Sequence, residues 1–223
     1  MLEGQKCLVI GSGISGIGAV ALLEKYHADV VLYDSSDKLT KEDLEAKLPG
    51  ESKAVCIAGE LPEEVELSIQ AAVLSPGVPT DIPLVNRMRD RGVQILGEIE
   101  LGFLAEQGRV IAITGTNGKT TTTTLTGEIM KAHFGAEKTF VVGNIGNPYT
   151  LEVTKTSKDS VTVGEISSFQ LETIHTFHPV VSAILNITPD HLNRHHTMEA
   201  YVAAKEAVAS QQTKADICVL NYD

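Results

Sequence analysis

The chain has 223 residues, enough for one large domain or two modest ones, each able to bury a core. Its 18 Lys and Arg against 29 Asp and Glu give a formal net charge of −11, which disfavours general binding to nucleic-acid phosphates. A content of 43% hydrophobic and 21% charged residues is typical of a soluble globular protein, and no stretch is long and apolar enough to span a membrane. Cys7, Cys56 and Cys218 lack the paired spacing of a zinc site and indicate reduced thiols in a cytoplasmic protein.

The first half of the chain alternates short β-branched runs with helix-length segments, the pattern of a parallel sheet covered by helices. The expected strands are 7–10, 29–33, 54–58, 71–74 and 93–96. A helix is expected from the turn after the first strand to about residue 28, and helices or charged loops are expected at 39–48 and 84–91. The run Ser75–Pro79 contains two prolines, so it predicts a loop at the carboxyl end of a strand.

The turn after the first expected strand carries a glycine pattern of phosphate-binding proteins. Gly11, Gly13 and Gly16 match GxGxxG, in which glycines allow a tight turn and a helix N-terminus faces a diphosphate. Asp34, at the end of the next strand, stands where an acidic side chain can accept hydrogen bonds from ribose hydroxyls. NAD is the first interpretation; another nucleotide diphosphate, or glycines with only a structural role, remain alternatives at this point.

The second half repeats the strand–loop–helix opening. Its expected strands are 109–113, 139–142, 160–166, 180–187 and 216–220, with helices to about 134 and over 198–210. The fold class predicted is therefore α/β with two successive parallel-sheet domains, residues 1–107 and 108–223. Because the sequence ends just after an expected strand, we expect the second sheet to be incomplete and the chain to be part of a longer protein.

The loop Thr114–Thr120 ends in Gly118-Lys119-Thr120, the tail of a P-loop. In such a loop, backbone N–H groups surround phosphate oxygens, the lysine offsets phosphate charge and the threonine hydroxyl can bind magnesium. The usual first glycine of the pattern is replaced by Ile113, and Gly115 supplies the earlier flexibility. Two phosphate-binding turns in one chain favour an ATP-driven enzyme whose other substrate carries its own diphosphate.

Further candidate residues follow later expected strands, at the edge where open α/β sheets bind ligands. Glu165 can reach a magnesium ion held by phosphates, or can simply begin the next helix. Asp190 and His191 can meet the same ion, although a single histidine is more often structural. The histidines at 191, 195 and 196 lack HExxH spacing, so zinc is discounted. Lys205 by itself predicts an ordinary exposed helical lysine.

Taken together, several strings resemble the Mur ligases, the ATP-dependent amide-forming enzymes of peptidoglycan precursor synthesis. The strings that carry this resemblance are Thr114–Thr120, Glu165–Glu172, Gly143–Gly146, Gly97–Leu101 and Asn186–His191. The resemblance covers the whole chain, and its most specific part is Glu165–Gln170. It implies a Rossmann-like first domain that binds a UDP-linked sugar, a P-loop-containing second domain, and a third, carboxyl-terminal domain that this sequence does not contain.

The resemblance assigns roles to the candidate residues. It implies that the UDP-sugar substrate is bound by Ser15, Gly16, Asp34, Ser75, Gly77, Asn144, Ser167 and Gln170. It implies that ATP is bound by Gly115, Thr116, Asn117, Gly118, Lys119, Thr120 and Thr121. It also implies that magnesium is held by Thr120, Glu165, His191 and Lys205, the last as a carbamate, and that Lys119, Glu165, His191 and Lys205 form the catalytic group.

The activity implied is joining D-glutamate to UDP-N-acetylmuramoyl-L-alanine through an acyl phosphate, in a cytoplasmic monomer that uses ATP and magnesium and binds neither nucleic acid nor membranes. The D-glutamate site is expected in the third domain, so the chain alone is expected to be inactive. Ser35-Ser36 stands where a relative can carry arginine, and Asn193 replaces an expected acidic residue. A non-catalytic nucleotide-binding module and an NAD-dependent oxidoreductase are the competing hypotheses.

Overall fold

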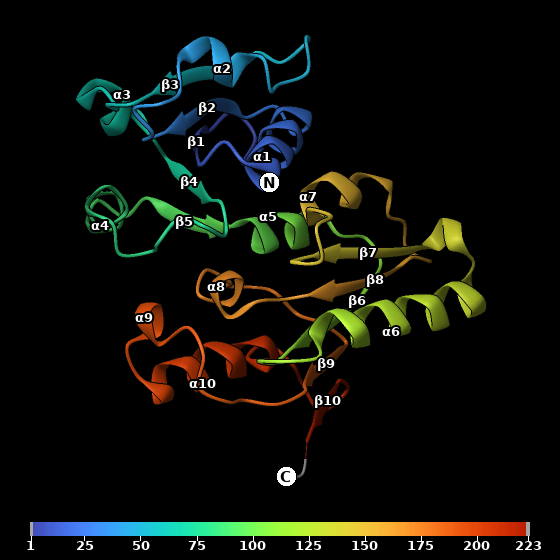
Figure 1. Ribbon diagram of the computed structural model, residues 1–223. Coiled ribbons are helices and arrows are strands. Elements are labelled where there is room, and N and C mark those ends of the chain that lie inside the picture. The colour runs from blue at the N-terminus through green and yellow to red at the C-terminus, as the bar shows by residue number, and fades with distance from the viewer. Residues whose placement is uncertain (1, 222–223) are drawn as a thin grey trace.

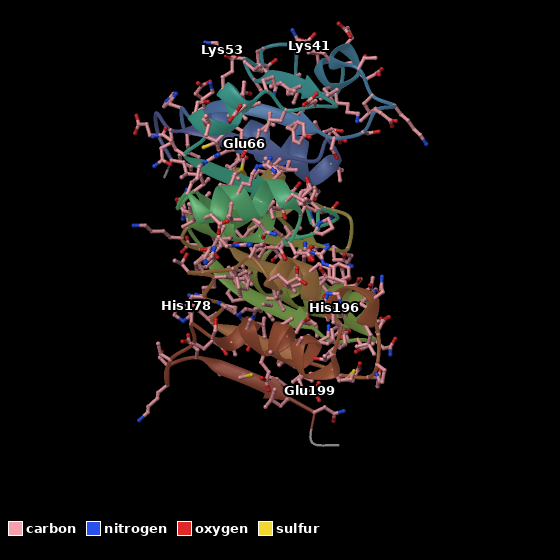
Figure 2. The ribbon with its side chains drawn as sticks, turned by 90° about the vertical axis from the view of Figure 1, so that its left-hand side faces the viewer. Lys41, Lys53, Glu66, His178, His196 and Glu199 are labelled. Carbon is pink, nitrogen blue, oxygen red and sulfur yellow. The ribbon has the colours of Figure 1, made fainter. Side chains whose placement is uncertain are left out.

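The computed structural model describes residues 2–221 and contains two five-stranded sheets, each parallel throughout. The first sheet and its helices occupy the upper part of Figure 1, and the second sheet occupies the lower part. In the view turned by 90°, Lys41 and Lys53 lie at the end formed by the first sheet and Glu199 lies near the opposite end (Figure 2). No helix among residues 2–221 combines the length and apolarity needed to cross a membrane.

The first sheet has the strand order β3-β2-β1-β4-β5. Its strands are β1 (Lys6–Ile10), β2 (Asp29–Asp34), β3 (Val55–Ala58), β4 (Ala71–Leu74) and β5 (Gln94–Gly97). Its helices are α1 (Ile14–Lys25), α2 (Lys41–Glu45), α3 (Glu63–Ser68) and α4 (Pro83–Asp90). The central strands are buried along nearly their whole length, because helices cover both faces of the sheet, and this is why they read as unbroken apolar runs.

The order of strands places a crevice at one edge of the first sheet. From β1 the chain moves outward through β2 to β3, then crosses back to β4 on the other side of β1. The loops after β1 and β4 therefore diverge from adjacent strand ends, which opens a crevice at the carboxyl edge of the sheet. The glycine-rich turn follows β1 and Ser75 follows β4.

The second sheet has the order β10-β9-β6-β8-β7. Its strands are β6 (Arg109–Thr114), β7 (Thr139–Gly143), β8 (Val161–Glu165), β9 (Val181–Ile184) and β10 (Ile217–Leu220). Its helices are α6 (Lys119–Phe134), α7 (Tyr149–Glu152), α8 (Ser168–Leu171), α9 (Leu192–His195) and α10 (Met198–Glu206), with 3₁₀ turns at Ala136–Lys138, Val153–Lys155 and Ala207–Ala209. Since β6 lies between β8 and β9, the loops after these three strands meet at one edge.

Helix α5 (Glu98–Ala105) joins the two sheets, and it packs with α1 and α7 into one continuous core. The close approach depends on Gly102, where an added Cβ would lie 2.7 Å from the ring of Tyr149. Glu98 is 2% exposed, and its Oε1 accepts hydrogen bonds from the backbone N and the Oγ1 of Thr150. The two sheets are thus held together by tertiary packing in addition to the covalent connection.

The α/β fold with two parallel sheets confirms the prediction from sequence, and the strands lie close to the expected ranges. The expected strand 180–187 is wrong at its end, because β9 stops at Ile184. Beyond Ile184 the backbone forms a hydrogen bond with the loop after β6, in which the carbonyl of Asn186 accepts from Thr116 N at 2.9 Å. The expected helix 198–210 is α-helical only to Glu206. The domain boundary at 107/108, between α5 and β6, stays a proposal.

Candidate nucleotide and substrate site

The glycine-rich turn after β1 is tightly folded against the loop after β4. Gly11 has φ +99°, a left-handed conformation that favours glycine. Ser75 donates from Oγ to the carbonyl of Gly11 at 3.1 Å. A Cβ on Gly16 would collide with that same carbonyl oxygen, whereas a Cβ on Gly13 would meet nothing within 4 Å. The first and third glycines of the motif are therefore required by packing, and Ser15 and Gly16 open helix α1 beside Ser75.

Asp34 holds the glycine-rich turn in place. Its Oδ2 accepts from the N of Ser12 at 2.9 Å and from the Oγ of Ser12 at 2.6 Å, and its Oδ1 accepts from Ser36 N at 3.1 Å. Lys47 donates to the Oγ of Ser12 at 2.9 Å. Burial raises the pKa of Asp34, but the hydrogen bonds from Ser12 and Ser36 outweigh it, so the pKa lies below its usual value. The expected contact of Asp34 with a nucleotide remains a proposal beside this structural role.

A cavity of about 450 Å³ adjoins the glycine-rich turn at the carboxyl edge of the first sheet. Its lining comes from the turn, the end of β2 and the loop after β4, and comprises Ile10, Gly11, Tyr33, Asp34, Ser35, Gly77, Val78, Pro79, Ile82, Pro83 and Leu84. Two other cavities, of about 560 and 620 Å³, are lined by residues outside both predicted phosphate-binding turns. The smaller cavity is the one whose walls include two of the predicted contacts, Asp34 and Gly77, together with Ser35.

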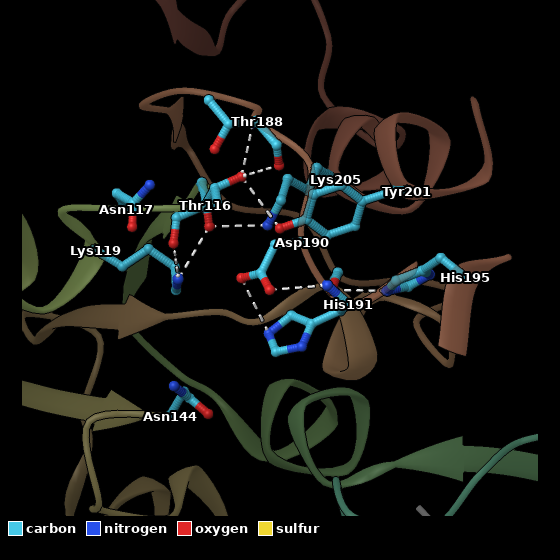
Figure 3. A network of polar contacts seen from close by, with 12 residues as sticks. Thr116, Asn117, Lys119, Asn144, Thr188, Asp190, His191, His195, Tyr201 and Lys205 are labelled. Carbon is cyan, nitrogen blue, oxygen red and sulfur yellow. Dashed lines mark hydrogen bonds and ion pairs between the residues drawn. The ribbon is translucent and has the colours of Figure 1, made fainter. Parts of the chain in front are cut away.

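The segment 114–120, called the lysine loop below, runs from the end of β6 into the first turn of α6 and changes direction at its two glycines. Gly115 has φ +151° and Gly118, which precedes α6, has φ +82°. Asn117 N donates to Asn186 Oδ1 at 2.8 Å, so the loop is tied to the segment after β9. Lys119 Nζ donates to the carbonyls of Gly115 at 3.0 Å and Thr116 at 2.9 Å (Figure 3). The lysine ammonium therefore lies over the loop whose phosphate-binding role the sequence predicted.

Lys205 is 1% exposed, which the sequence did not predict, since an ordinary helical lysine faces solvent. Its Nζ donates to the carbonyl of Gly115 at 2.8 Å and lies 4.6 Å from the centroid of the Tyr201 ring. Burial, with a further contribution from Lys119, lowers the pKa of Lys205 from 10.5 to about 8, against an opposing effect of Asp190. Figure 3 shows Lys205 and Lys119 approaching the loop from different elements.

Tyr201 was missed from the sequence and supports this cluster. It is 1% exposed, and its hydroxyl lies 3.2 Å from Thr116 Oγ1, which also accepts from Thr188 N at 3.0 Å. Tyr201 and Lys205 are four residues apart, so they lie on one face of α10, and that spacing is the signal that could have paired them. The tyrosine covers the lysine and fixes the loop side chain beside it.

Glu165 ends β8, directly beside the end of β6, and is 2% exposed. Its Oε1 accepts from Asn144 Nδ2 at 2.8 Å, while its Oε2 is buried without a hydrogen-bond partner among residues 2–221. A buried anionic oxygen without a partner is costly, and a cation would compensate it. The described part of the chain has no cluster of three His, Cys, Asp or Glu side chains, so an ion here would need hydroxyl or ligand oxygens as well.

The segment after β9 brings Asp190 and His191 toward the same edge. His191 has φ +52°, and its Nε2 lies 3.4 Å from Asp190 Oδ2. In Figure 3, Asp190 lies between His191 and the pair Tyr201 and Lys205. Asn144 is placed below the lysine loop in that view. Of the predicted residues, Asn144, His191 and Lys205 thus lie around this loop in Figure 3.

Ser167, Gln170 and His195 are engaged within the protein. Ser167 and Gln170 form a capping box at the start of α8, with the Gln170 Oε1 accepting from Ser167 Oγ at 2.9 Å. His195 is 7% exposed, and its Nε2 lies 2.9 Å from the Oγ of Ser168. Burial lowers the pKa of His195, which favours the neutral ring. These contacts fix α8, the helix that follows Glu165.

Comparisons with known proteins agree with the two-sheet arrangement. The Mur ligase MurD-like N-terminal domain matches residues 5–97, and the Mur ligase middle domain matches residues 113–223. A UDP-N-acetylmuramoylalanine--D-glutamate ligase of Lachnospira eligens is 58% identical over 222 residues, which is 100% of this chain and 49% of that protein. The enzyme of the same name from Clostridioides difficile is 47% identical, with 100% and 49% covered. The chain spans about half the length of these relatives.

Solved structures show the same fold. A UDP-N-acetylmuramate:L-alanyl-gamma-D-glutamyl-meso-diaminopimelate ligase from Neisseria meningitides superposes with a TM-score of 0.60 at 14% identity, covering 98% of this chain and 71% of that one. A murein peptide ligase from Psychrobacter arcticus gives 0.56 at 14% identity, covering 97% and 49%. Because two Mur ligase family models match successive parts of the sequence, residues 5–97 and 113–223, the chain belongs to the Mur ligase family.

Proposed function

We propose that this chain forms the UDP-substrate and ATP-binding part of a ligase that joins D-glutamate to UDP-N-acetylmuramoyl-L-alanine. The observation that carries the proposal is the match over the whole chain, at 58% identity, to a relative with that name. The two loops alone would not suffice, since similar turns occur in many nucleotide-binding proteins. The site for D-glutamate is proposed to lie in the part of those relatives that this chain does not match.

The first-sheet cavity is the proposed place of the UDP group. Gly16 and Ser15 present the N-terminal end of α1, whose N–H groups and dipole favour a diphosphate. Gly77 lines the cavity and Ser75 holds the turn that shapes it. Asp34, held by Ser12, sets the conformation of the turn in this account.

The acceptor carboxylate must then reach the edge of the second sheet. Asn144, Ser167 and Gln170 are proposed to position the sugar and its alanine: Asn144 follows β7 and donates to Glu165, and Ser167 and Gln170 begin α8, the helix that follows Glu165. Binding both reactants on a rigid frame supplies the in-line geometry that phosphoryl transfer needs.

The lysine loop is proposed to hold the triphosphate through the backbone N–H groups of Gly115–Thr121 and the ammonium of Lys119. When bound, ATP supplies the γ-phosphoryl group that converts an unreactive carboxylate into an acyl phosphate. Lys119 offsets the charge of two anionic reactants. Its present acceptors are backbone carbonyls of the loop, so it can exchange them for phosphate oxygens without leaving a buried ion pair.

The chemistry of three residues near the strand ends suits a magnesium ion. Thr120 offers a hydroxyl, Glu165 offers the unpartnered Oε2, and His191 lies on the adjoining segment. Lys205 is proposed to act as a carbamate: its neutral amine would form an N–C bond to carbon dioxide with loss of a proton. A pKa of about 8 leaves part of the amine neutral near pH 7.5, which favours that reaction.

A full-length protein carrying this sequence tests the proposal with UDP-N-acetylmuramoyl-L-alanine labelled with ¹⁸O in its alanine carboxylate. We expect phosphate release that needs D-glutamate, and phosphate that carries one ¹⁸O, because the carboxylate oxygen leaves with the phosphoryl group. Release of unlabelled phosphate would contradict an acyl phosphate. Binding of UDP and ATP with no phosphate release would favour a non-catalytic module.

A further inference from the structure

Glu172 lies where three segments of the fold meet. It follows α8, the short helix that begins after Glu165. Its Oε2 accepts from Arg194 Nη2 at 2.7 Å and from Thr80 Oγ1 at 3.3 Å. Arg194 belongs to α9, which starts directly after His191, and Thr80 belongs to the loop after β4. One carboxylate therefore connects a loop of the first sheet with two elements of the second.

Arg194 makes the same connection by itself. Its Nη2 also donates to the carbonyl of Val78 at 3.4 Å, and its guanidinium carbon lies 4.5 Å from the centroid of the Phe169 ring. Val78 is part of the wall of the first-sheet cavity. The side chains of Arg194 and Glu172 are only 16% and 18% exposed, so solvent screens the pair less than it would a surface ion pair. The arginine thus contacts the wall of one site and supports the helix that follows the other.

We propose that Arg194, held by Glu172, is a positioning residue that couples the first-sheet cavity to the lysine-loop site. The inference rests on the proposed function, since it takes UDP and magnesium–ATP as the two ligands. A ligand packed against Val78 orders the loop 75–80, and that loop bears on Arg194 and therefore on the segment that carries His191. Because the first ligand has then already ordered part of the shared structure, the second ligand loses less conformational entropy when it binds. The two ligands therefore bind with positive coupling.

The contacts of Arg194 and Glu172 between the two sheets also bear on the reaction. The UDP end of the acceptor is held at the first sheet and the phosphoryl donor at the second, so the carboxylate reaches the donor only if the loops of the two sheets keep their spacing. Misplacement of reacting groups by about 1 Å can cost on the order of 100-fold in rate. Arg194 contacts neither ligand in this account and acts through Val78, Glu172 and the turn after His191.

The test is a calorimetric titration of UDP into this chain, with and without saturating magnesium and the non-hydrolysable ATP analogue AMP-PNP. We expect the analogue to tighten UDP binding by about 5-fold or more in the unsubstituted chain, the lower range of usual coupling. In Arg194→Met and in Glu172→Gln, we expect that ratio to fall below about 2-fold. The affinity for UDP alone should change less than the ratio does. Thermal unfolding shows whether each variant is folded, and Glu172→Gln decides if Arg194→Met is not.

Arg89 of α4 offers a matched control, because it contacts the same loop. Its Nη2 donates to the carbonyl of Thr80 at 3.1 Å and its Nη1 to Asn86 Oδ1 at 2.8 Å, so these hydrogen bonds join it to residues of the first-sheet half. Arg89→Met should keep the coupling ratio. Three results would each overturn the inference and leave the proposed function standing. They are a loss of coupling in Arg89→Met, an unchanged ratio in both Arg194→Met and Glu172→Gln, and a ratio of one in the unsubstituted chain. Failure of the unsubstituted chain to bind either ligand would overturn the proposed function as well.

Discussion

Lys119 and Lys205 donate hydrogen bonds to the same acceptor, the carbonyl oxygen of Gly115, at 3.0 and 2.8 Å. Two ammonium groups therefore meet at one backbone oxygen, one from the start of α6 and the other from α10. Their mutual repulsion contributes to the lowered pKa of Lys205. A polyanion bound at this loop would relieve that repulsion, so the arrangement favours a phosphate ligand over an empty loop.

Replacing Lys205 by methionine should change how stability depends on pH. The pKa of Lys205 is about 8 in the folded chain, below its ordinary 10.5, so between these pH values the unfolded chain binds more protons at this residue. Its contribution to the free energy of unfolding therefore rises as pH increases from about 8 to about 10.5 and is constant below that window. Urea unfolding at pH 7.5 and pH 10 measures this rise.

In Lys205→Met that rise should be missing, so the variant gains less stability than the unsubstituted chain between the two pH values. Lys155→Met is the matched control, since Lys155 is exposed and pairs with Glu152 on the surface. An equal pH dependence in Lys205→Met and the unsubstituted chain would show that Lys205 titrates normally.

Lys119→Met should weaken binding of magnesium–AMP-PNP by about 10-fold or more, because charge-assisted hydrogen bonds to phosphate are among the stronger polar contacts. Affinity for UDP measured alone should stay the same, since Lys119 belongs to the second sheet. Lys131→Met, a change at a partly exposed lysine of the same helix that pairs with Glu128, should leave both affinities unaltered. Calorimetry on the three proteins makes the comparison, and an unaltered nucleotide affinity in Lys119→Met would argue against a phosphate-binding loop.

Gly16→Ala should disturb the glycine-rich turn, because its Cβ would collide with the carbonyl oxygen of Gly11. We expect a loss of about 1–3 kcal/mol in the free energy of unfolding, as for other overpacked sites, together with weaker UDP binding. Gly13→Ala is the matched control: its Cβ meets nothing within 4 Å, so stability should change by no more than about 0.5 kcal/mol. Denaturant unfolding compares the two, and similar losses in both variants would be inconsistent with the packing described here.

Glu98→Gln should remove a pH-dependent cost at the joint between the sheets. Burial raises the pKa of Glu98 above its ordinary 4.5, against the hydrogen bonds from Thr150. The folded chain therefore holds this proton more tightly than the unfolded chain, and the contribution of Glu98 to stability falls as pH rises above about 4.5. Unfolding at pH 5 and pH 8 should show a smaller fall in Glu98→Gln. A fall of equal size would mean that Glu98 is charged at little cost.

Much of the fold could be predicted from the sequence, because parallel strands buried on both faces are continuous apolar runs, as in Cys7–Ile10, and because glycine turns follow them directly. The packing between the two sheets could not be predicted. It depends on Gly102 admitting the ring of Tyr149 and on Glu98 bonding Thr150, contacts between residues about 50 positions apart that leave no local pattern.

Some features of the candidate site could also be predicted from the sequence, and others could not. Lys119 and Glu165 follow strands and could be placed at a sheet edge from sequence alone. The burial of Lys205 under Tyr201 could not be predicted, because lysines are usually exposed and the local sequence does not show that this ammonium group is buried. Asp34 was placed correctly at the end of β2, yet its hydrogen bonds to Ser12 depend on the packing of the glycine-rich turn.

The central claim is that each phosphate-binding turn has its own ligand, and simultaneous titration tests it most directly. UDP and magnesium–AMP-PNP should each bind this chain with a stoichiometry of one, neither displacing the other, with UDP binding weakened in Gly16→Ala and AMP-PNP binding weakened in Lys119→Met. NAD should not compete with UDP. Displacement of one nucleotide by the other, or of UDP by NAD, would contradict the account.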